Sequence, residues 1–300
     1  MNLESPRDAV ISVGRIYCDL VFSGLSGMPQ MGHEVFARSM QPVLGGGAFI
    51  AAAHLSHLDR PAALLAAYGT DPLSQTLATQ LEESGIDLRF LERRADAGPQ
   101  VTVVMTNAED RAFLSCRAGR AVPPRFANAL AWERAALLHI AEYATLDEQP
   151  DLVSRAKAAG LVVALDPSWD ETLIGQPGLL KACAGVDIFL PNAEEAAAIT
   201  GKSDLAQALD VLADHFPIVA IKCGGRGGLL GAGKTRLSTT APKVHVVDTT
   251  GAGDAFNAGL IDAYLSGRAL GECLDAGVTA GSLSVQSIGG APRPATSVAV

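Results

Sequence analysis

Short apolar runs alternate along this chain with longer segments of helical pattern. The apolar runs read as buried strands at 9–13, 63–67, 136–140, 161–165, 186–190 and 218–222, and helical patterns cover 48–58, 71–84, 151–159, 194–199 and 255–265. Parallel strands need a crossover between them, and a helix is the usual crossover. The alternation therefore predicts an α/β fold with a mostly parallel sheet flanked by helices on both faces.

Two stretches interrupt this alternation. Residues 16–43 show no good helical period and contain several glycines, while 100–105 and 111–116 form a predicted hairpin around 107–110. These stretches predict a small β lid, contributed by about 14–43 and 98–120, beside the main sheet. Because the chain contains neither an internal repeat nor a low-complexity linker, we expect a single domain over residues 1–300.

The composition argues against several classes of protein. The 300 residues are 48% hydrophobic, enough for a large core, and the net charge of −9 argues against a nucleic-acid partner, because cations supply most of that affinity. The five cysteines form no Cys-x-x-Cys pair, so neither a zinc site nor a disulfide framework is expected. The amino terminus lacks the apolar core of a signal peptide and no apolar run could span a membrane, so we predict a cytoplasmic protein.

The segment Asp248-Thr-Thr-Gly-Ala-Gly-Asp254 is the most informative local feature of the chain. It follows a predicted strand at 244–247 and precedes the predicted helix at 255–265, so its glycines lie at the amino terminus of a helix. Free backbone N–H groups at that position favour an anion, and glycine lets the backbone approach a phosphate closely.

The carboxylate of Asp254 needs a separate explanation, because it would repel a bound phosphate. A base that accepts the proton of an attacking hydroxyl explains it, with the neighbouring N–H groups stabilising the transferring phosphoryl group. A structural alternative is that Asp254 caps the helix by accepting hydrogen bonds from its first N–H groups. The spacing alone leaves both interpretations open.

The run Asp-Thr-Thr-Gly-Ala-Gly-Asp-Ala-Phe-x-Ala-Gly closely resembles the carboxy-terminal signature of the ribokinase-like (PfkB) carbohydrate kinases. The resemblance implies a ribokinase-like fold and ATP-dependent phosphorylation of a hydroxyl group on a sugar or nucleoside, with Mg²⁺. It assigns the role of base to Asp254 and the anion hole to the amides of Gly251, Ala252 and Gly253. It also implies a lid that excludes water as a competing acceptor and that often pairs between subunits, so we expect a homodimer.

The nucleotide side of the family is matched at two further elements. Leu190-Pro-Asn-Ala-Glu-Glu-Ala196 resembles an element that helps to place magnesium and phosphates, partly through water, which implies this role for Asn192 and Glu195. The same spacing is also a capping box, which is the structural alternative. A glycine turn in 221–228 resembles the family's turn under the nucleotide, and it implies phosphate-side positions for Lys222, Gly224 and Gly227.

The carboxy-terminal residues 277–290 resemble the last helix of the family, against which adenine packs. Asp248 and Thr250, with carbonyl groups near Ser284 and Gly289, match the place where many members hold a monovalent cation. The resemblance therefore leaves a potassium site open as an expectation.

The acceptor side is matched less completely. Gly14–Asp19 resembles the Gly-x-x-x-x-Asp element, and Gly45 with Gly46 resembles the paired glycines of the amino-terminal signature. The resemblance implies that the Asp19 carboxylate accepts hydrogen bonds from sugar hydroxyls. It also implies a sugar contact for Glu142, for which a solvated surface acid is the alternative.

Phe49 and Ile50 depart from the family pattern, because sugar kinases of the family usually carry an asparagine in this region. These side chains predict an acceptor face more apolar than ribose would require. We expect the acceptor to be a hydroxymethyl-type alcohol.

The segment Gly228-Leu-Leu-Gly-Ala-Gly-Lys-Thr235 fits the pattern of a phosphate-binding P-loop. A P-loop must open a helix, but residues 236–242 are rich in β-branched side chains and end in proline, so a hairpin turn with exposed Lys234 and Thr235 is favoured. Two rival functions are a P-loop NTPase that uses Lys234 and a non-catalytic sugar or nucleotide sensor of the same fold.

Overall fold

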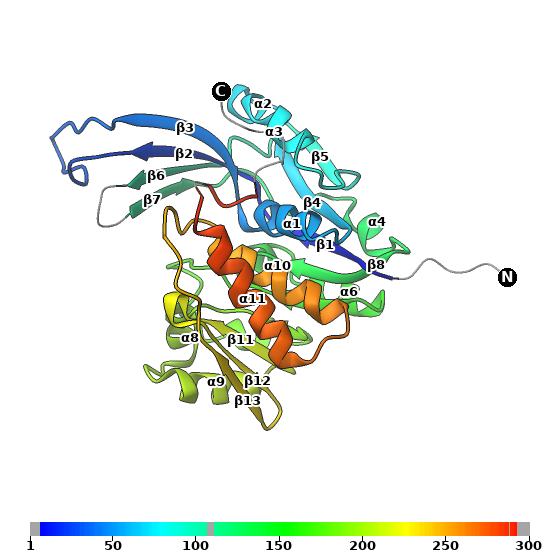
Figure 1. Cartoon of the computed structure of the whole chain (residues 1–300). Coiled ribbons are helices and arrows are strands. Elements are labelled where there is room, and N and C mark those ends of the chain that lie inside the picture. Colours follow the sequence, from blue (N-terminus) through cyan, green and yellow to red (C-terminus); the bar gives the residue numbers. More distant parts are fainter. Residues whose placement is uncertain (1–6, 107–110, 288, 293–300) are drawn as a thin grey trace.

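The computed structural model describes residues 7–106, 111–287 and 289–292. Within them, a nine-stranded sheet has the order β13-β12-β11-β10-β9-β8-β1-β4-β5 (Figure 1). Its strands are β1 (Ala9–Val13), β4 (Ala62–Gly69), β5 (Leu91–Arg94), β8 (Ala135–Ile140), β9 (Val162–Leu165), β10 (Ile188–Phe189), β11 (Ile218–Lys222), β12 (Gly228–Ala232) and β13 (Thr235–Thr239). The strands from β11 to β5 pair in parallel, whereas β12 and β13 form an antiparallel edge.

Helices cover both faces of this sheet. One face packs against α1 (Gly47–His57), α2 (Pro72–Thr76), α3 (Ala78–Glu82), α10 (Ala252–Leu265) and α11 (Leu270–Ser284). The other packs against α4 (Phe126–Leu130), α5 (Tyr143–Glu148), α6 (Leu152–Ala158), α7 (Leu179–Ala182), α8 (Ala193–Thr200) and α9 (Leu205–Ala213). A hydrophobic core lies on each face of the sheet. Successive strand residues point into alternate cores, since Val10 belongs to the first and Ile11 to the second. The predicted α/β fold is confirmed.

A second, four-stranded sheet has the order β3-β2-β6-β7 and projects from one side of the molecule (Figure 1). Its strands are β2 (Tyr17–Ser23), β3 (Ser39–Gly45), β6 (Val101–Thr106) and β7 (Arg111–Cys116). They come from the two stretches that interrupt the helical alternation of the sequence, although β3 extends to Gly45, beyond the predicted limit at residue 43. The predicted turn at 107–110 lies outside the described residues.

Helices α10 and α11 lie against each other along their length, in front of the large sheet (Figure 1). The close approach depends on glycine, because a Cβ on Gly259 would lie only 2.6 Å from the carbonyl oxygen of Ala276. The pair brings Phe256 and Val278 to one wall of the pocket described below.

Two local predictions were wrong. Residues 241–248 contain no strand, so the predicted strand at 244–247 is instead an irregular connection whose Val246 side chain is 55% exposed. The predicted helix at 71–84 is divided into α2 and α3, which meet at Leu77. No helix in the described part of the chain is long and apolar enough to cross a membrane.

Candidate active site

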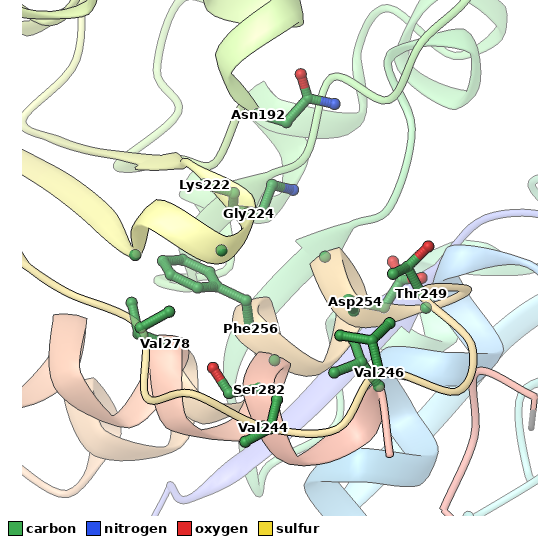
Figure 2. Close-up of a pocket in the computed structure, with 18 of the residues that line it drawn as sticks. Asn192, Lys222, Gly224, Val244, Val246, Thr249, Asp254, Phe256, Val278 and Ser282 are labelled. Carbon is green, nitrogen blue, oxygen red and sulfur yellow. The ribbon is translucent and has the colours of Figure 1, made fainter. Parts of the chain in front are cut away.

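A pocket of about 570 Å³ opens where β9, β10 and β11 end and α10 begins (Figure 2). Asp166 follows β9, Asn192 lies just beyond β10, and Lys222 ends β11. These side chains therefore meet at the carboxyl edge of the parallel strands, where ligands bind in open α/β sheets. The pocket brings together the predicted residues Asn192, Glu195, Lys222, Gly224, Gly227, Gly251, Ala252, Gly253 and Asp254.

Asp254 lies in the first turn of α10, whose cap residue is Gly251. Gly251 has a φ of 72°, and a Cβ there would lie 2.5 Å from the Cα of Gly290, so glycine is required. No described side chain caps this helix, and the cap interpretation of Asp254 is wrong. The carboxylate approaches the start of α1 instead, since a Cβ on Gly47 would lie 2.8 Å from its Oδ1.

The surroundings of Asp254 disfavour its charged form. Burial is the main cause that raises its pKa to about 7, and the carboxylates of Asp166, Glu195 and Asp19 act in the same direction. The ammonium of Lys222 opposes them. Since a general base is most effective when its pKa lies near the working pH, Asp254 is suited to exchange a proton close to neutrality.

Lys222 is held by the buried carboxylate of Asp166. Its Nζ lies 2.5 Å from Oδ2 of Asp166, and Nδ2 of Asn257 donates to the same oxygen at 2.6 Å. The side chains of Lys222 and Asp166 are only 11% and 7% exposed. A Cβ on Gly253 would lie 3.5 Å from Nζ, so the ammonium lies beside the glycine loop.

Asn192 and Glu195 form the capping box of α8. The Glu195 N–H donates to Oδ1 of Asn192 at 2.9 Å, and the Asn192 N–H donates to Oε2 of Glu195 at 2.7 Å. The structural alternative is thus present, and both residues also line the pocket. Burial, followed by Asp166, raises the pKa of Glu195 to about 7. In the described ranges no group of three or more His, Cys, Asp or Glu side chains could hold a metal ion.

The other end of the pocket is apolar. Its walls include Val244, Phe256 and Val278 (Figure 2). Gly224 and Gly227 form the turn beside these side chains, and a Cβ on Gly227 would lie 1.9 Å from the carbonyl oxygen of Thr239. A flat apolar ring at this end and a chain of phosphates toward Asp254 would match the shape and polarity of the pocket.

The predicted acceptor residues Asp19, Gly45 and Gly46 lie together where the small sheet meets α1. Asp19 is 8% exposed, and its Oδ2 would lie 1.9 Å from a Cβ on Gly45. Burial raises the pKa of Asp19 to about 7, while a hydrogen bond with Thr102 of β6 opposes that shift. The absence of a side chain at Gly45 is therefore what lets the Asp19 carboxylate occupy this position.

Glu142 is not a solvated surface acid, since its side chain is 13% exposed. Its Oε1 accepts hydrogen bonds from the guanidinium of Arg15 at 3.2 Å and from the hydroxyl of Thr145 at 3.0 Å. The same guanidinium also contacts Glu148 and the carbonyl oxygen of Gly119. Arg15 therefore fixes Glu142 and joins it to the segment that follows β7.

Asp248 connects the glycine loop to the carboxy-terminal segment. Its Oδ1 accepts a hydrogen bond from the Thr250 N–H at 2.8 Å, and its Oδ2 accepts one from the Gly289 N–H at 2.9 Å. The residues predicted to hold a monovalent cation are thus brought together.

Phe49 and Ile50 do not supply an apolar acceptor face, which corrects the inference drawn from them. They are 4% and 3% exposed and belong to the core beneath α1. Ile50 packs against the glycine loop, because Cβ atoms on Gly251 and Gly290 would lie 3.0 and 2.6 Å from its side chain.

The P-loop interpretation of residues 228–235 is wrong. These residues form the hairpin of β12 and β13, in which Ala232 pairs with Thr235, and no helix follows. Lys234 is exposed in the turn and Thr235 is the exposed first residue of β13, so the competing hairpin interpretation is confirmed.

Several functional candidates were missed in the sequence. Asp166 follows a buried strand directly, and an acid at that position was a usable signal. Asn257 and Arg15 gave no such signal, because a polar residue in a helix or a turn is unremarkable until its neighbours are known.

Comparisons with known proteins agree with this arrangement. The family model of the pfkB family carbohydrate kinases matches residues 9–296. A nucleoside kinase of Methanothermobacter thermautotrophicus is 27% identical over 277 residues, covering 90% of this chain and 87% of that protein. An uncharacterized sugar kinase of Archaeoglobus fulgidus is 26% identical over 233 residues, covering 73% of this chain and 89% of the relative.

Solved structures show the same fold. Arabidopsis thaliana ribokinase complexed with ribose and ATP gives a TM-score of 0.81 at 23% identity, covering 95% of this chain and 94% of that one. An Escherichia coli structure in complex with ATP and Mg²⁺ gives a TM-score of 0.78 at 20% identity, covering 94% of each chain. Because the family model extends over nearly the whole chain, this protein belongs to the pfkB family of carbohydrate kinases and is a small-molecule carbohydrate or nucleoside kinase.

Proposed function

We propose that the protein transfers the γ-phosphoryl group of ATP to a hydroxymethyl-type alcohol of a sugar or nucleoside, with Asp254 as the base. The observation that carries this proposal is the position of Asp254. Its carboxylate lies in the first turn of α10, within a pocket that continues to an apolar end, and it faces the glycine start of α1.

The reaction is a displacement at phosphorus. The acceptor oxygen forms a bond to the γ-phosphorus while the bond from that phosphorus to the β-phosphate oxygen breaks, and ADP leaves. The acceptor proton passes to the Asp254 carboxylate. The amides of Gly251, Ala252 and Gly253, at the amino terminus of α10, stabilise the charge on the transferring group.

In this proposal the nucleotide binds with its base at the apolar end and its phosphates along the glycine turns. Gly224, Gly227 and Lys222 border the phosphate path, and Asn192 and Glu195 border it from α8. Bound magnesium would neutralise phosphate charge, with phosphate oxygens and water as its main ligands. The oxygen donors of Asn192 and Glu195 suit that ion.

The acceptor is placed between Asp254 and Asp19, below the small sheet. Hydroxyl groups of the acceptor donate to the Asp19 carboxylate and approach the backbone at Gly45 and Gly46, and Glu142 borders the same space. The small sheet acts as a lid that keeps water from replacing the alcohol as phosphoryl acceptor.

An apolar face of the small sheet supports a homodimer. Leu20, Phe22, Met40, Met105 and Leu114 share one face, because cross-strand partners lie on the same side. Met40 and Leu114 are 51% and 66% exposed. We propose that a second copy of the chain covers this face, since contiguous exposed apolar patches mark interaction sites.

Two further expectations remain proposals. One is a potassium ion beside Asp248 and Thr250. If it binds there, turnover should be higher in potassium buffer than in tetramethylammonium buffer. A cytoplasmic location is favoured by the cysteines, none of which is disulfide-bonded in the described residues. Cell fractionation tests that location.

Asp254→Asn tests the proposed base. We expect the variant to fold, to bind ATP and to lose turnover by about 10²–10⁴-fold or more, because an amide does not accept the proton. The measurement is ADP release over a panel of sugars and nucleosides, with thermal unfolding as the control for folding. Near-wild-type turnover of Asp254→Asn would overturn the proposal, and a wild-type chain that binds ligands but releases no ADP would favour the sensor alternative.

A further inference from the structure

A buried ionic cluster lies between the end of β11 and the first turns of α10. Nζ of Lys222 contacts Oδ2 of Asp166 at 2.5 Å and Oδ1 of Asn257 at 3.4 Å. Nδ2 of Asn257 donates to the same Asp166 oxygen at 2.6 Å, and the Ser168 N–H donates to its other oxygen at 3.1 Å. Each member of the cluster therefore orients the others.

This cluster is a poor device for stability alone. A buried ion pair loses the solvation of both charges, and a well-packed apolar pair of similar volume is often as stable. The residues are also not sealed in the core, since Asp166 and Lys222 line the same pocket as Asp254. An ammonium has three donors, and the contacts to Asp166 and Asn257 account for two of them.

The charges around Lys222 are strongly unbalanced. The carboxyl groups of Asp166, Glu195 and Asp254 all favour the charged form of Lys222, whereas burial lowers the pKa of His139 to about 4, so this imidazole adds no second cation. A nucleotide triphosphate would add more negative charge at this place. Among these groups Lys222 carries the positive charge, and it lies beside Gly253 of the glycine loop.

The geometry of α10 connects the cluster to the proposed base. Asp254 and Asn257 are three residues apart on this helix, so their side chains lie on one face. Asn257 is fully buried and cannot reach a ligand itself. Its amide instead links the helix that carries the base to the Asp166–Lys222 pair.

We propose that Asp166 and Asn257 are positioning residues that hold the Lys222 ammonium against the path of the transferring phosphoryl group. This inference rests on the proposed function and deepens it. Lys222 neither gives nor takes a proton in the step. Its charge stabilises the negative charge of the phosphoryl oxygens as the group passes from ATP to the acceptor and ADP leaves.

The test compares Lys222→Met, Asp166→Asn and the double variant, with Lys234→Met as the matched control in the exposed hairpin turn. We expect Lys222→Met to lower kcat by about 10²–10³-fold, as for the loss of one transition-state donor, with little change in the acceptor KM. Asp166→Asn should lower kcat by about tenfold, because the ammonium stays but is less well held. Lys234→Met should behave as wild type.

The double variant separates positioning from a structural role. Asp166 acts through Lys222, so adding Asp166→Asn to Lys222→Met should not lower kcat further. It should raise the melting temperature above that of Lys222→Met, because no unpaired buried carboxylate remains. Recovery of both melting temperature and kcat in the double variant would show a merely structural pair and overturn the inference.

Equilibrium binding gives a readout that does not depend on turnover. Lys222→Met should weaken ATP binding by about tenfold while changing ADP binding much less, because the ammonium acts on the terminal phosphate. Equal weakening of both nucleotides would overturn this placement. If Asp254→Asn kept its turnover while the Lys222 variants lost theirs, the proposed base would be wrong and the role of Lys222 would stand.

Discussion

The two ends of the candidate active site differ in the groups that form them. The phosphoryl end consists of backbone amides at the start of α10 and of charged side chains that are largely buried, such as Lys222 and Asp166. The proposed acceptor end is formed by the Asp19 carboxylate of β2, by the backbone at Gly45 and Gly46, and by Glu142 at the start of α5. Under the proposed function, phosphoryl transfer would depend on the tightly packed glycine loop, whereas the choice of acceptor would depend on a few side chains.

This difference indicates at which positions of the site a substitution is tolerated. An added methyl group at Gly251 would collide with the Cα of Gly290, and one at Gly47 would collide with the Asp254 carboxylate, so the phosphoryl end leaves no room. The proposed acceptor residue Asp19 lies on β2, whose backbone pairing with β6 can persist when that side chain changes.

Gly47→Ala is expected to have the largest effect, because it breaks the phosphoryl end. Its methyl group would lie 2.8 Å from Oδ1 of Asp254 and displace the proposed base. We expect kcat/KM to fall by at least about 100-fold, since a displacement near 1 Å can cost that much. Steady-state kinetics measure the loss. Gly175→Ala is the matched control, because nothing lies within 4 Å of a Cβ there. Unchanged turnover in Gly47→Ala would contradict the geometry.

Asp19→Asn addresses the acceptor end and should have a smaller effect. Loss of a charged hydrogen-bond acceptor should raise the acceptor KM by about 10–100-fold, with a smaller change in kcat. Asp147→Asn, on an exposed position, is the control. Kinetics with varied acceptor at saturating ATP measure the split, and a change confined to the ATP KM would refute this placement of the acceptor.

The pH dependence distinguishes the two carboxylates. The pKa of both Asp254 and Asp19 is raised to about 7, mainly by burial. A base must be ionised, so kcat/KM should fall about tenfold per pH unit as the pH drops below 7, and it should level off above that pH. If Asp254 is the group responsible, Asp19→Asn keeps the acidic limb. Disappearance of the limb in Asp19→Asn would assign it to Asp19 instead.

Leu114→Glu should have the smallest effect on turnover and a clear effect on assembly. A charge on the exposed apolar face of the small sheet should convert the proposed homodimer to a monomer, while kcat changes by less than about threefold, because the substitution lies outside the pocket. Sedimentation or light scattering measures the mass. Leu58→Glu, at an exposed leucine elsewhere, is the control. A monomeric wild-type chain would refute the homodimer.

The pattern of the sequence was sufficient to predict the α/β fold and the family. Strands such as β1 and β8 are mostly apolar because both faces of the parallel sheet are covered, and this signal is visible without a structure. It failed at 244–247, where four residues with strand propensity serve as an irregular connection. A local propensity is decided by the partners that a segment finds, and this one finds no neighbouring strand.

The glycine loop from Asp248 to Asp254 was determined by the sequence itself, because glycines followed by a helix fix both the backbone and the place of the acid. The ion pair of Lys222 with Asp166 was decided only by the tertiary structure. The two residues are 56 positions apart, and they meet because parallel strands end at one edge of the sheet. Local spacing reports the shape of a loop, whereas the neighbours of a buried charge depend on how distant strands are ordered.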